Sequence, residues 1–239
     1  NHGRLTQQLI DTLETISADQ GIDAFLLPDS DDFDAIPQDP DNPITASKVR
    51  LGRSLFHETG VGTATLAPDR SETYGCATCH HAGAGFKAGL QQGIGDGGTG
   101  FANSGAGRRL AKGMNPDAND GDPAKPDFQP VTSPAALNTA YQAVMLWDGS
   151  LGNSDDGINQ TADNLHHVGP AGVMVNKFGL KGLETQVLAG TRVHRLRFDE
   201  NSVLQTHPAY VDLYNEAFPG GFTGHIPEGS IVTPEALGA

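Results

Sequence analysis

The strongest constraint on this chain is the placement of its only two cysteines, in the run Cys76-Ala77-Thr78-Cys79-His80. No other cysteine can pair with either of them, and a disulfide between them would close a small, strained ring. Two thiols at this spacing on one helical turn can each bond a vinyl group of a haem, and the histidine that follows can then reach the iron. The run therefore predicts one covalently attached haem c, with His80 as the proximal iron ligand.

Two other uses of a cysteine pair have to be weighed against haem. A thioredoxin-like redox pair would need a βαβ context, which the glycine-rich flanks of the motif do not provide. A zinc site would need a second pair of ligands at comparable spacing, and the sequence has none. The sequence favours haem over both. The second ring nitrogen of His80 is then expected to donate to a backbone carbonyl or to water.

The sequence does not choose a second axial ligand for the iron. The candidates are His81, Met114, Met145, His166, His167, Met174 and His194. His81 is set aside because a neighbour on the same helical turn points about 100° away from His80. Methionines at helical spacing pack in cores more often than they bind metal. We therefore expect an iron whose sixth position is open or holds water.

The composition indicates a loop-rich protein with a modest core. Apolar residues make up 37% of the 239 residues, and the chain contains 31 glycines and 15 prolines. A buried haem would supply part of the missing apolar volume. The formal net charge of −14 argues against nucleic acid or an anionic membrane as a partner.

No targeting or membrane-spanning segment is visible in the sequence. No apolar stretch approaches the roughly 18 residues that a membrane-spanning helix requires. The first residues also lack the basic and apolar regions of a signal peptide. We therefore expect a processed chain that works in the periplasm or is otherwise exported.

Apolar periodicity predicts a mostly α fold, because helical spacing recurs and no segment of useful length alternates as a strand does. Helices are expected at residues 4–19, 45–56, 133–145, 183–198 and 202–218. Thr45 is a suitable N-cap, and Pro134 directly after Ser133 is a strong helix start. Between Gly83 and Asp127, many glycines without periodicity predict a long irregular loop over a rigid support. The fold class expected is a cytochrome c-like haem domain with long Gly-rich loops.

Three parts of the chain are expected. Residues 1–44 form an N-terminal helix and a linker rich in proline and aspartate. Residues 45–232 form the haem domain. Residues 233–239 begin a second haem domain that is truncated: Thr233-Pro234-Glu235 has the features of a helix start, but the few residues after it cannot sustain a helix.

Four motifs in a fixed order resemble a known family. They are LGRSLF (51–56), CATCH (76–80), SPAALNTAY (133–141) and LWDGS (146–150), followed by Asn159 and Gln160. This order is similar to the N-terminal half of bacterial di-haem cytochrome c peroxidases and their relative MauG. The likeness runs from about Thr45 to Ala239. It implies two α-helical cytochrome c domains, each with one haem, that meet around a calcium ion.

The resemblance implies roles for three further residues. Trp147 matches the tryptophan between the two haems, which helps electrons pass. Gln160 matches a glutamine that lines the peroxide pocket, and Asn138 matches a calcium-ligating asparagine. The implied activity is that of a peroxidase-type oxidoreductase, which reduces hydrogen peroxide with electrons from a small redox protein. Taken alone, a single tryptophan more often packs in a core, and an asparagine within a helix can simply bond locally.

Two departures from the family pattern leave other functions open. The run 169–174 has Val173 where the family carries a pocket glutamate, and Ser150 replaces the usual arginine. A positioned general acid or base is worth about 10²–10⁴ in rate, so slow peroxide turnover is expected. The alternatives are a c-type electron carrier without catalysis and a MauG-like enzyme that oxidises side chains of a partner protein.

Overall fold

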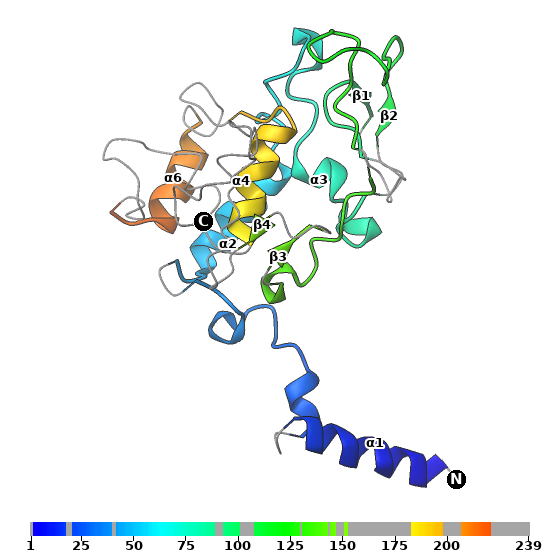
Figure 1. Cartoon of the computed structure of the whole chain (residues 1–239). Helices are drawn as coiled ribbons and strands as arrows, with labels where there is room; N and C mark the ends of the chain where they lie inside the picture. Colours follow the sequence, from blue (N-terminus) through cyan, green and yellow to red (C-terminus); the bar gives the residue numbers. More distant parts are fainter. Residues whose placement is uncertain are drawn as a thin grey trace, which may run out of the picture. The chain divides into compact units, whose positions relative to one another are not determined.

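The computed structural model describes most of the chain in ten stretches (Figure 1). They are residues 2–17, 21–39, 42–88, 93–100, 108–129, 131–142, 144–146, 151–152, 183–197 and 207–220. The chain divides into two compact units, Asn1–Ile36 and Pro37–Ala239. This division does not test the domain boundaries expected from the sequence, which stay a prediction.

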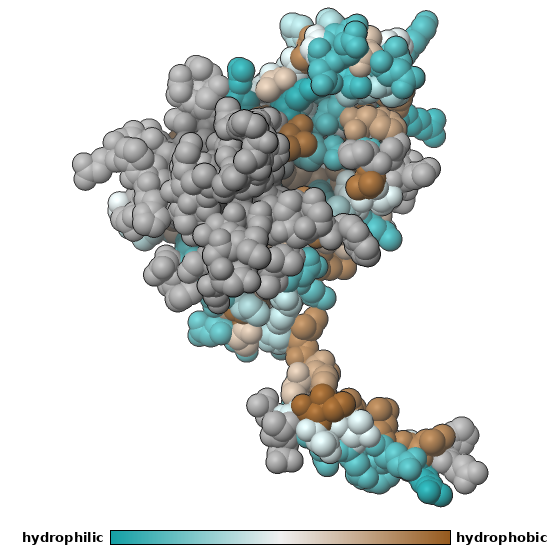
Figure 2. Space-filling view, in the orientation of Figure 1, coloured by the Kyte–Doolittle hydropathy of each residue, from teal (hydrophilic) through white to brown (hydrophobic). Residues whose placement is uncertain are grey.

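The first unit is built on helix α1, His2–Ile16, which confirms the helix predicted from the apolar stripe. Figure 2 shows apolar side chains gathered along this helix, where Leu5, Leu9 and Ile16 are exposed. Two short 3₁₀ helices follow, η1 (Ile22–Phe25) and η2 (Phe33–Ala35). The second of them, η2, lies within the stretch from Pro28 to Pro43 that the sequence predicts as an extended linker.

The second unit is mostly helical with little strand, as predicted, and this is compatible with a cytochrome c-like fold (Figure 1). In the described parts of this unit the α-helices are α2 (Ala46–His57), α3 (Cys76–Cys79), α4 (Leu183–Val193) and α6 (Pro208–Ala217). Its 3₁₀ helices are η3 (Pro68–Arg70), η4 (Ala82–Ala84) and η5 (Thr139–Tyr141). Two antiparallel pairs of short strands join β1 (Gly98–Thr99) to β2 (Arg109–Leu110) and β3 (Val144–Met145) to β4 (Leu151–Gly152).

Helix α2 begins as the sequence predicts. The Thr45 side chain accepts a hydrogen bond from the backbone N–H of Lys48 at 3.2 Å, which satisfies one of the free donors of the first turn. Helix α6 has Pro208 in its first turn, where the missing N–H costs nothing. Its N-cap is His207, whose ring accepts from the N–H of Ala209. Both helices therefore have a defined start that local sequence chemistry explains.

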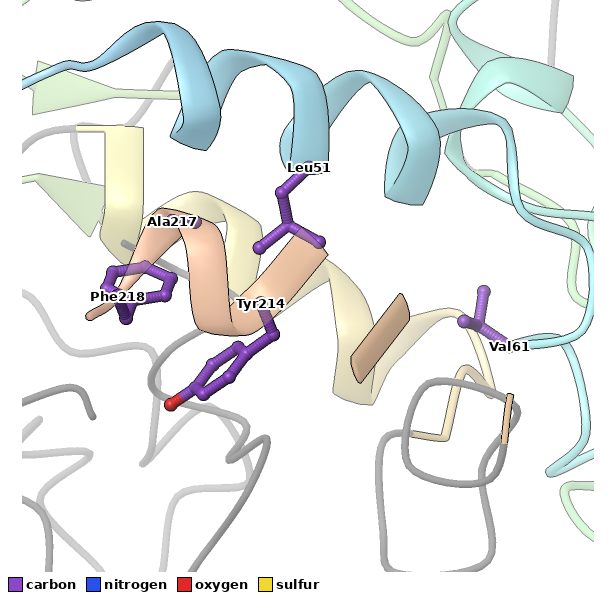
Figure 3. Close-up of a cluster of buried hydrophobic side chains, with 5 residues drawn as sticks. All are labelled: Leu51, Val61, Tyr214, Ala217 and Phe218. Atoms are coloured by element: carbon purple, nitrogen blue, oxygen red, sulfur yellow. The ribbon is translucent and has the colours of Figure 1, made fainter. Parts of the chain in front are cut away.

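The apolar core lies between α2 and α6. It contains Leu51 from α2, Val61 from the loop after α2, and Tyr214, Ala217 and Phe218 at the end of α6 (Figure 3). Helix α2 also packs against α3, the helix that carries the two cysteines. The core thus fixes the long helix on which the short cysteine helix rests.

The helix predicted at residues 133–145 is wrong. In its place the structure has the single turn η5 followed by strand β3, whose Val144 and Met145 pair with Gly152 and Leu151 of β4. The physical reason is local, because Asn138 has a φ of 58° in the left-handed region. Asparagine visits this region more readily than most residues, and a residue there cannot continue a right-handed helix.

Candidate haem-binding site

Helix α3 is a single turn that holds both cysteines. Gly75 caps it, with its N–H donating to the Thr78 hydroxyl at 3.0 Å. A Cβ at Gly75 would lie 2.4 Å from the backbone oxygen of Glu58, so only glycine allows this close approach. The turn closes where the N–H of His80 donates to the carbonyl of Cys76 at 2.9 Å. The backbone therefore places two thiols and one imidazole within one turn.

The imidazole of His80 is held in one tautomer. Its Nδ1 lies 3.1 Å from the carbonyl oxygens of both Phe86 and Pro134. A carbonyl oxygen only accepts, so Nδ1 carries the proton and Nε2 keeps a free lone pair. Burial lowers the pKa of His80, and this also favours the neutral ring. The free lone pair of Nε2 is therefore available to bind a metal.

The two thiols are free and neutral. Neither is in a disulfide. Burial raises the pKa of Cys76 to about 11 and that of Cys79 to about 12. A catalytic thiol pair of the thioredoxin kind needs a lowered pKa, because the thiolate is the nucleophile. Burial instead raises the pKa of both Cys76 and Cys79, so the redox-pair alternative loses support.

An aromatic wall borders His80. The ring of Phe56, from the end of α2, lies 6.4 Å from the His80 ring and 6.1 Å from the ring of Phe86. Both aromatic side chains give this side of the site an apolar lining. Their part in the site was not predicted: Phe56 was named only as the last residue of an expected helix and of the motif LGRSLF, and Phe86 lies in a glycine-rich stretch without periodicity.

A short two-stranded ladder lies beside Cys79. Ile94 pairs with Phe128, and the N–H of Gln129 donates to the carbonyl of Gly93 at 3.0 Å. A Cβ at Gly93 would lie 2.9 Å from the Cys79 sulfur, which shows how closely this ladder approaches the thiol. The ladder therefore forms one boundary of the site.

A buried ionic cluster joins three distant segments behind this ladder. The carboxylate of Asp96, which is fully buried, forms ion pairs with Arg70 and Arg195 and accepts from the N–H of Leu66 at 2.9 Å. The hydroxyl of Tyr74 lies 3.0 Å from two carbonyls, those of His194 and Arg195. Sequence reasoning missed this cluster because its members lie far apart in the chain.

The candidates for the sixth iron position divide into two groups. His166, His167 and Met174 lie outside the described residues, while the other four are placed. The Met114 sulfur lies 2.8 Å from a guanidinium nitrogen of Arg70, and Met145 is almost fully buried. His194 is bonded at Nδ1 by Gln129.

The reasoning that set His81 aside is corrected by the structure. Helix α3 ends at Cys79, so His81 does not share a helical turn with His80. Its backbone is extended, with φ −82° and ψ 126°, and it pairs with Lys87 in an isolated β-bridge. The backbone at His81 therefore follows its pairing with Lys87 and not the geometry of the preceding helix.

The remaining predicted site residues are placed only in part. Trp147, Ser150, Gln160 and Val173 lie outside the described residues. Asn138 is exposed and precedes η5. Within the described stretches, no group of three or more His, Cys, Asp or Glu side chains could hold a metal ion. The calcium role of Asn138 therefore stays a prediction.

The residues of this site fit a covalently bound haem. Two neutral, unpaired thiols stand three residues apart on one turn, and the next side chain offers Nε2 with Nδ1 already bonded. A mostly helical unit with this turn is compatible with a cytochrome c-like haem domain. None of the helices in the described stretches is long and apolar enough to span a membrane.

Comparison with known proteins identifies the family. The sequence model of the di-haem cytochrome c peroxidases matches residues 46–237, and the chain belongs to this family. The resemblance drawn from the four motifs is thereby confirmed. This family binds haem c, which agrees with the haem predicted for Cys76 and Cys79.

A curated relative supports the same assignment. A stretch of 116 residues is 28% identical to the methylamine utilization protein MauG of Methylorubrum extorquens. The match covers 48% of this chain and 23% of that protein, so the chain corresponds to a minor part of this relative. No solved structure matches the chain.

Proposed function

We propose that this chain is a haem c domain of a peroxidase-type oxidoreductase, with the haem bonded to Cys76 and Cys79 and its iron bound by His80. The observation that carries the proposal is the pair of carbonyls at His80 Nδ1, which leaves Nε2 for the metal beside two free thiols. When bound, the haem supplies a redox-active iron. The protein fixes the ring of His80 and provides the apolar lining of Phe56 and Phe86.

The proposed working unit contains two haem domains. Residues 45–232 form the haem domain of this chain, residues 1–44 the preceding helix and linker, and residues 233–239 lead into a second haem domain. The full-length protein would then carry two haems. Support comes from the family match, because the family is di-haem. We place the protein in the periplasm or otherwise outside the cytoplasm.

Three residues complete the proposal through their places in the family motifs. Trp147 passes electrons from the second haem domain, Gln160 lines the peroxide pocket, and Asn138 binds calcium between the domains. Hydrogen peroxide is the substrate, and a small redox protein is the electron donor. The net charge of −14 would suit a donor with a basic surface.

The proposal can be tested through Val173. Because a positioned carboxylate can add about 10²–10⁴ in rate, Val173→Glu should raise peroxide turnover above that of the parent protein. Val173→Gln is the matched control, since it has the same length and cannot carry a proton. Equal turnover in all three proteins, at equal haem content, would mean that the peroxide pocket does not include this residue.

An electron carrier without catalysis is the second candidate, and the valine at position 173 favours it. The optical spectrum of the ferric protein distinguishes the two. High-spin bands indicate an open iron and support the peroxidase, whereas a purely low-spin spectrum with a methionine signature and no peroxide turnover would establish the carrier. MauG-like oxidation of a partner protein is a third candidate, supported by the similarity to MauG.

A further inference from the structure

Helix α1 has an apolar side that its own unit leaves uncovered. We call this side the α1 stripe, and its members are Leu5, Leu9, Thr12 and Ile16. Leu5, Leu9 and Ile16 are 64%, 58% and 66% exposed, and Figure 2 shows the apolar surface along the helix. Successive helical residues turn by about 100°, so the four side chains lie within about 60° of one another around the axis. The stripe is therefore narrow as well as exposed.

The spacing of the α1 stripe matches the seam of a coiled coil. Its members follow one another at intervals of four, three and four residues, as the a and d positions of a heptad do. On the adjoining side of the helix, Leu13 is half-buried and Ser17 is buried, and the helix contacts η1. A stripe made only of a and d positions fits one partner helix, whereas a helix on a globular core needs a wider apolar face. The occupant that suits this stripe is therefore a second helix.

Covering the α1 stripe would bury neither an unpaired polar hydrogen nor a charge. The hydroxyl of Thr12, the polar member of the stripe, donates to the carbonyl of Gln8 at 2.7 Å. The charged residues of the helix are Arg4, Asp11 and Glu14. Their positions lie more than about 100° from the centre of the stripe. A neighbouring helix can therefore approach without the cost of desolvating a charged group.

A second copy of α1 that runs in the opposite direction is complementary to the stripe. In that arrangement Leu5 of one copy faces Ile16 of the other, and Leu9 faces Thr12. Each contact occurs twice, because a pair of identical helices is related by a two-fold axis. The larger Leu9 also meets the smaller Thr12, so the two central layers of the seam are not overfilled. The α1 stripe thus supplies both halves of a matching interface.

The charges of the first unit favour the antiparallel direction. Among residues 1–36, Arg4 near the start of α1 is the only lysine or arginine. The segment after the helix contains six aspartates: Asp19, Asp23, Asp29, Asp31, Asp32 and Asp34. A parallel pair would bring two such acidic segments to the same end, where they repel each other. An antiparallel pair separates them and places Arg4 of each copy at the end where the acidic segment of the other copy begins.

We propose that the chain self-associates through an antiparallel pair of α1 helices, in which each helix covers the α1 stripe of the other. The helix has 15 residues and is therefore about 22 Å long. An interface of this length buries less than the roughly 1,200 Å² of a standard interface, so we expect a reversible dimer with a dissociation constant on the order of 100 µM. Each dimer would carry two copies of the haem domain.

Sedimentation equilibrium of the haem-loaded protein between about 1 µM and about 1 mM tests this proposal. The parent should pass from monomer to dimer in this range. The double variant Leu5→Gln/Leu9→Gln should associate at least about tenfold more weakly, because it replaces two apolar side chains of each seam by polar ones. Leu110→Gln is the matched control, since it makes the same change at an exposed leucine on β2, and its dissociation constant should equal that of the parent.

Far-ultraviolet circular dichroism checks that the double variant keeps its helix, which is expected because glutamine and leucine have similar helix propensities. Leu9→Ala gives a second test that does not depend on this check, because alanine has the highest helix propensity. It also removes most of the side chain from the seam, so its association should be weaker than that of the parent by several-fold.

Two single variants, Leu5→Cys and Ile16→Cys, test the direction of the helices. In the haem-loaded protein Cys76 and Cys79 are bonded to the haem, so the new cysteine is the free thiol of each variant. When the two variants are mixed and oxidised, an antiparallel pair predicts disulfides between one variant and the other. A parallel pair predicts disulfides within each variant.

Three outcomes would overturn the proposal. A parent that stays monomeric up to about 1 mM would show that the stripe has a different occupant, such as the haem domain of the same chain or another protein. A dimer that is equally strong in Leu5→Gln/Leu9→Gln would show that another surface joins the copies. Disulfides only within each variant would refute the antiparallel pair. All three leave the haem site unaffected, so they do not count against the proposed function.

Discussion

Replacing Asp96 by asparagine perturbs the most deeply buried charge among the described residues. The side chain of Asp96 is 0% exposed, while those of its partners Arg70 and Arg195 are 9% and 22% exposed. It also accepts from the backbone N–H of Leu66. The substitution keeps the shape and removes the negative charge, which leaves two guanidinium groups facing a neutral amide.

The expected loss follows from these burial values. Removing one partner of a buried ion pair costs about 3–5 kcal/mol, because the remaining charge stays in a medium that solvates it poorly. Arg195 is partly reached by water and recovers some solvation, so we expect about 3 kcal/mol for Asp96→Asn. The matched control is Glu216→Gln on α6, whose partner Arg50 is 45% exposed. Exposed pairs contribute about 0–1 kcal/mol, so this control should be nearly neutral.

Denaturant unfolding of the haem-loaded proteins, followed by far-ultraviolet circular dichroism, measures the loss of stability in Asp96→Asn and in Glu216→Gln. The midpoint for Asp96→Asn should fall clearly while the slope with denaturant stays unchanged, which would indicate a change in stability alone. A loss below about 1 kcal/mol for Asp96→Asn, or a loss equal to that of Glu216→Gln, would contradict the view that this cluster holds the segments together.

Two further changes test how the site is supported. Tyr210→Phe removes the hydrogen bond from the Tyr210 hydroxyl to Glu58 and should cost about 1–3 kcal/mol. Burial and then Glu58 raise the pKa of Tyr210. The contribution of Tyr210 to stability should therefore be complete below about pH 10 and be lost as the pH rises further. An alkaline titration in which the variant and the parent lose stability together would contradict this expectation. Gly75→Ala places a Cβ 2.4 Å from the Glu58 carbonyl, and we expect a loss of about 1–3 kcal/mol and a lower haem content. Gly52→Ala, in open space on α2, should instead stabilise by about 0.5–1 kcal/mol, and equal haem content in both glycine variants would argue against a tight fit at Gly75.

Local chemistry explains what the sequence could predict. Thr45 caps α2 as predicted, because a cap depends on residues only a few positions away. The start of α6 at Pro208 was not predicted, although a proline in the first turn is a local signal of the same kind. The run from Cys76 to His80 specifies a one-turn site for the same reason. Chemistry alone also predicted that the second ring nitrogen of His80 would donate to a backbone carbonyl or to water, but not that the carbonyls of Phe86 and Pro134 would be the acceptors.

Contacts between distant residues explain what was missed. Asp96 and Arg195 are 99 positions apart, so no local pattern joins them. The helix predicted at residues 133–145 failed at Asn138, whose left-handed backbone outweighed the good start at Ser133 and Pro134. The ion pair depends on the path of the chain through the folded unit, and the failed helix on the backbone conformation of one residue; apolar periodicity describes neither.

The most direct test of the account is the intact mass of the exported, purified protein under denaturing conditions. Covalent attachment predicts a mass of the 25.0 kDa polypeptide plus one haem, with neither Cys76 nor Cys79 open to alkylation. Cys76→Ala should reduce or abolish the retained haem. A mass equal to that of the bare polypeptide, with both thiols alkylated, would contradict the haem site on which the proposed function depends.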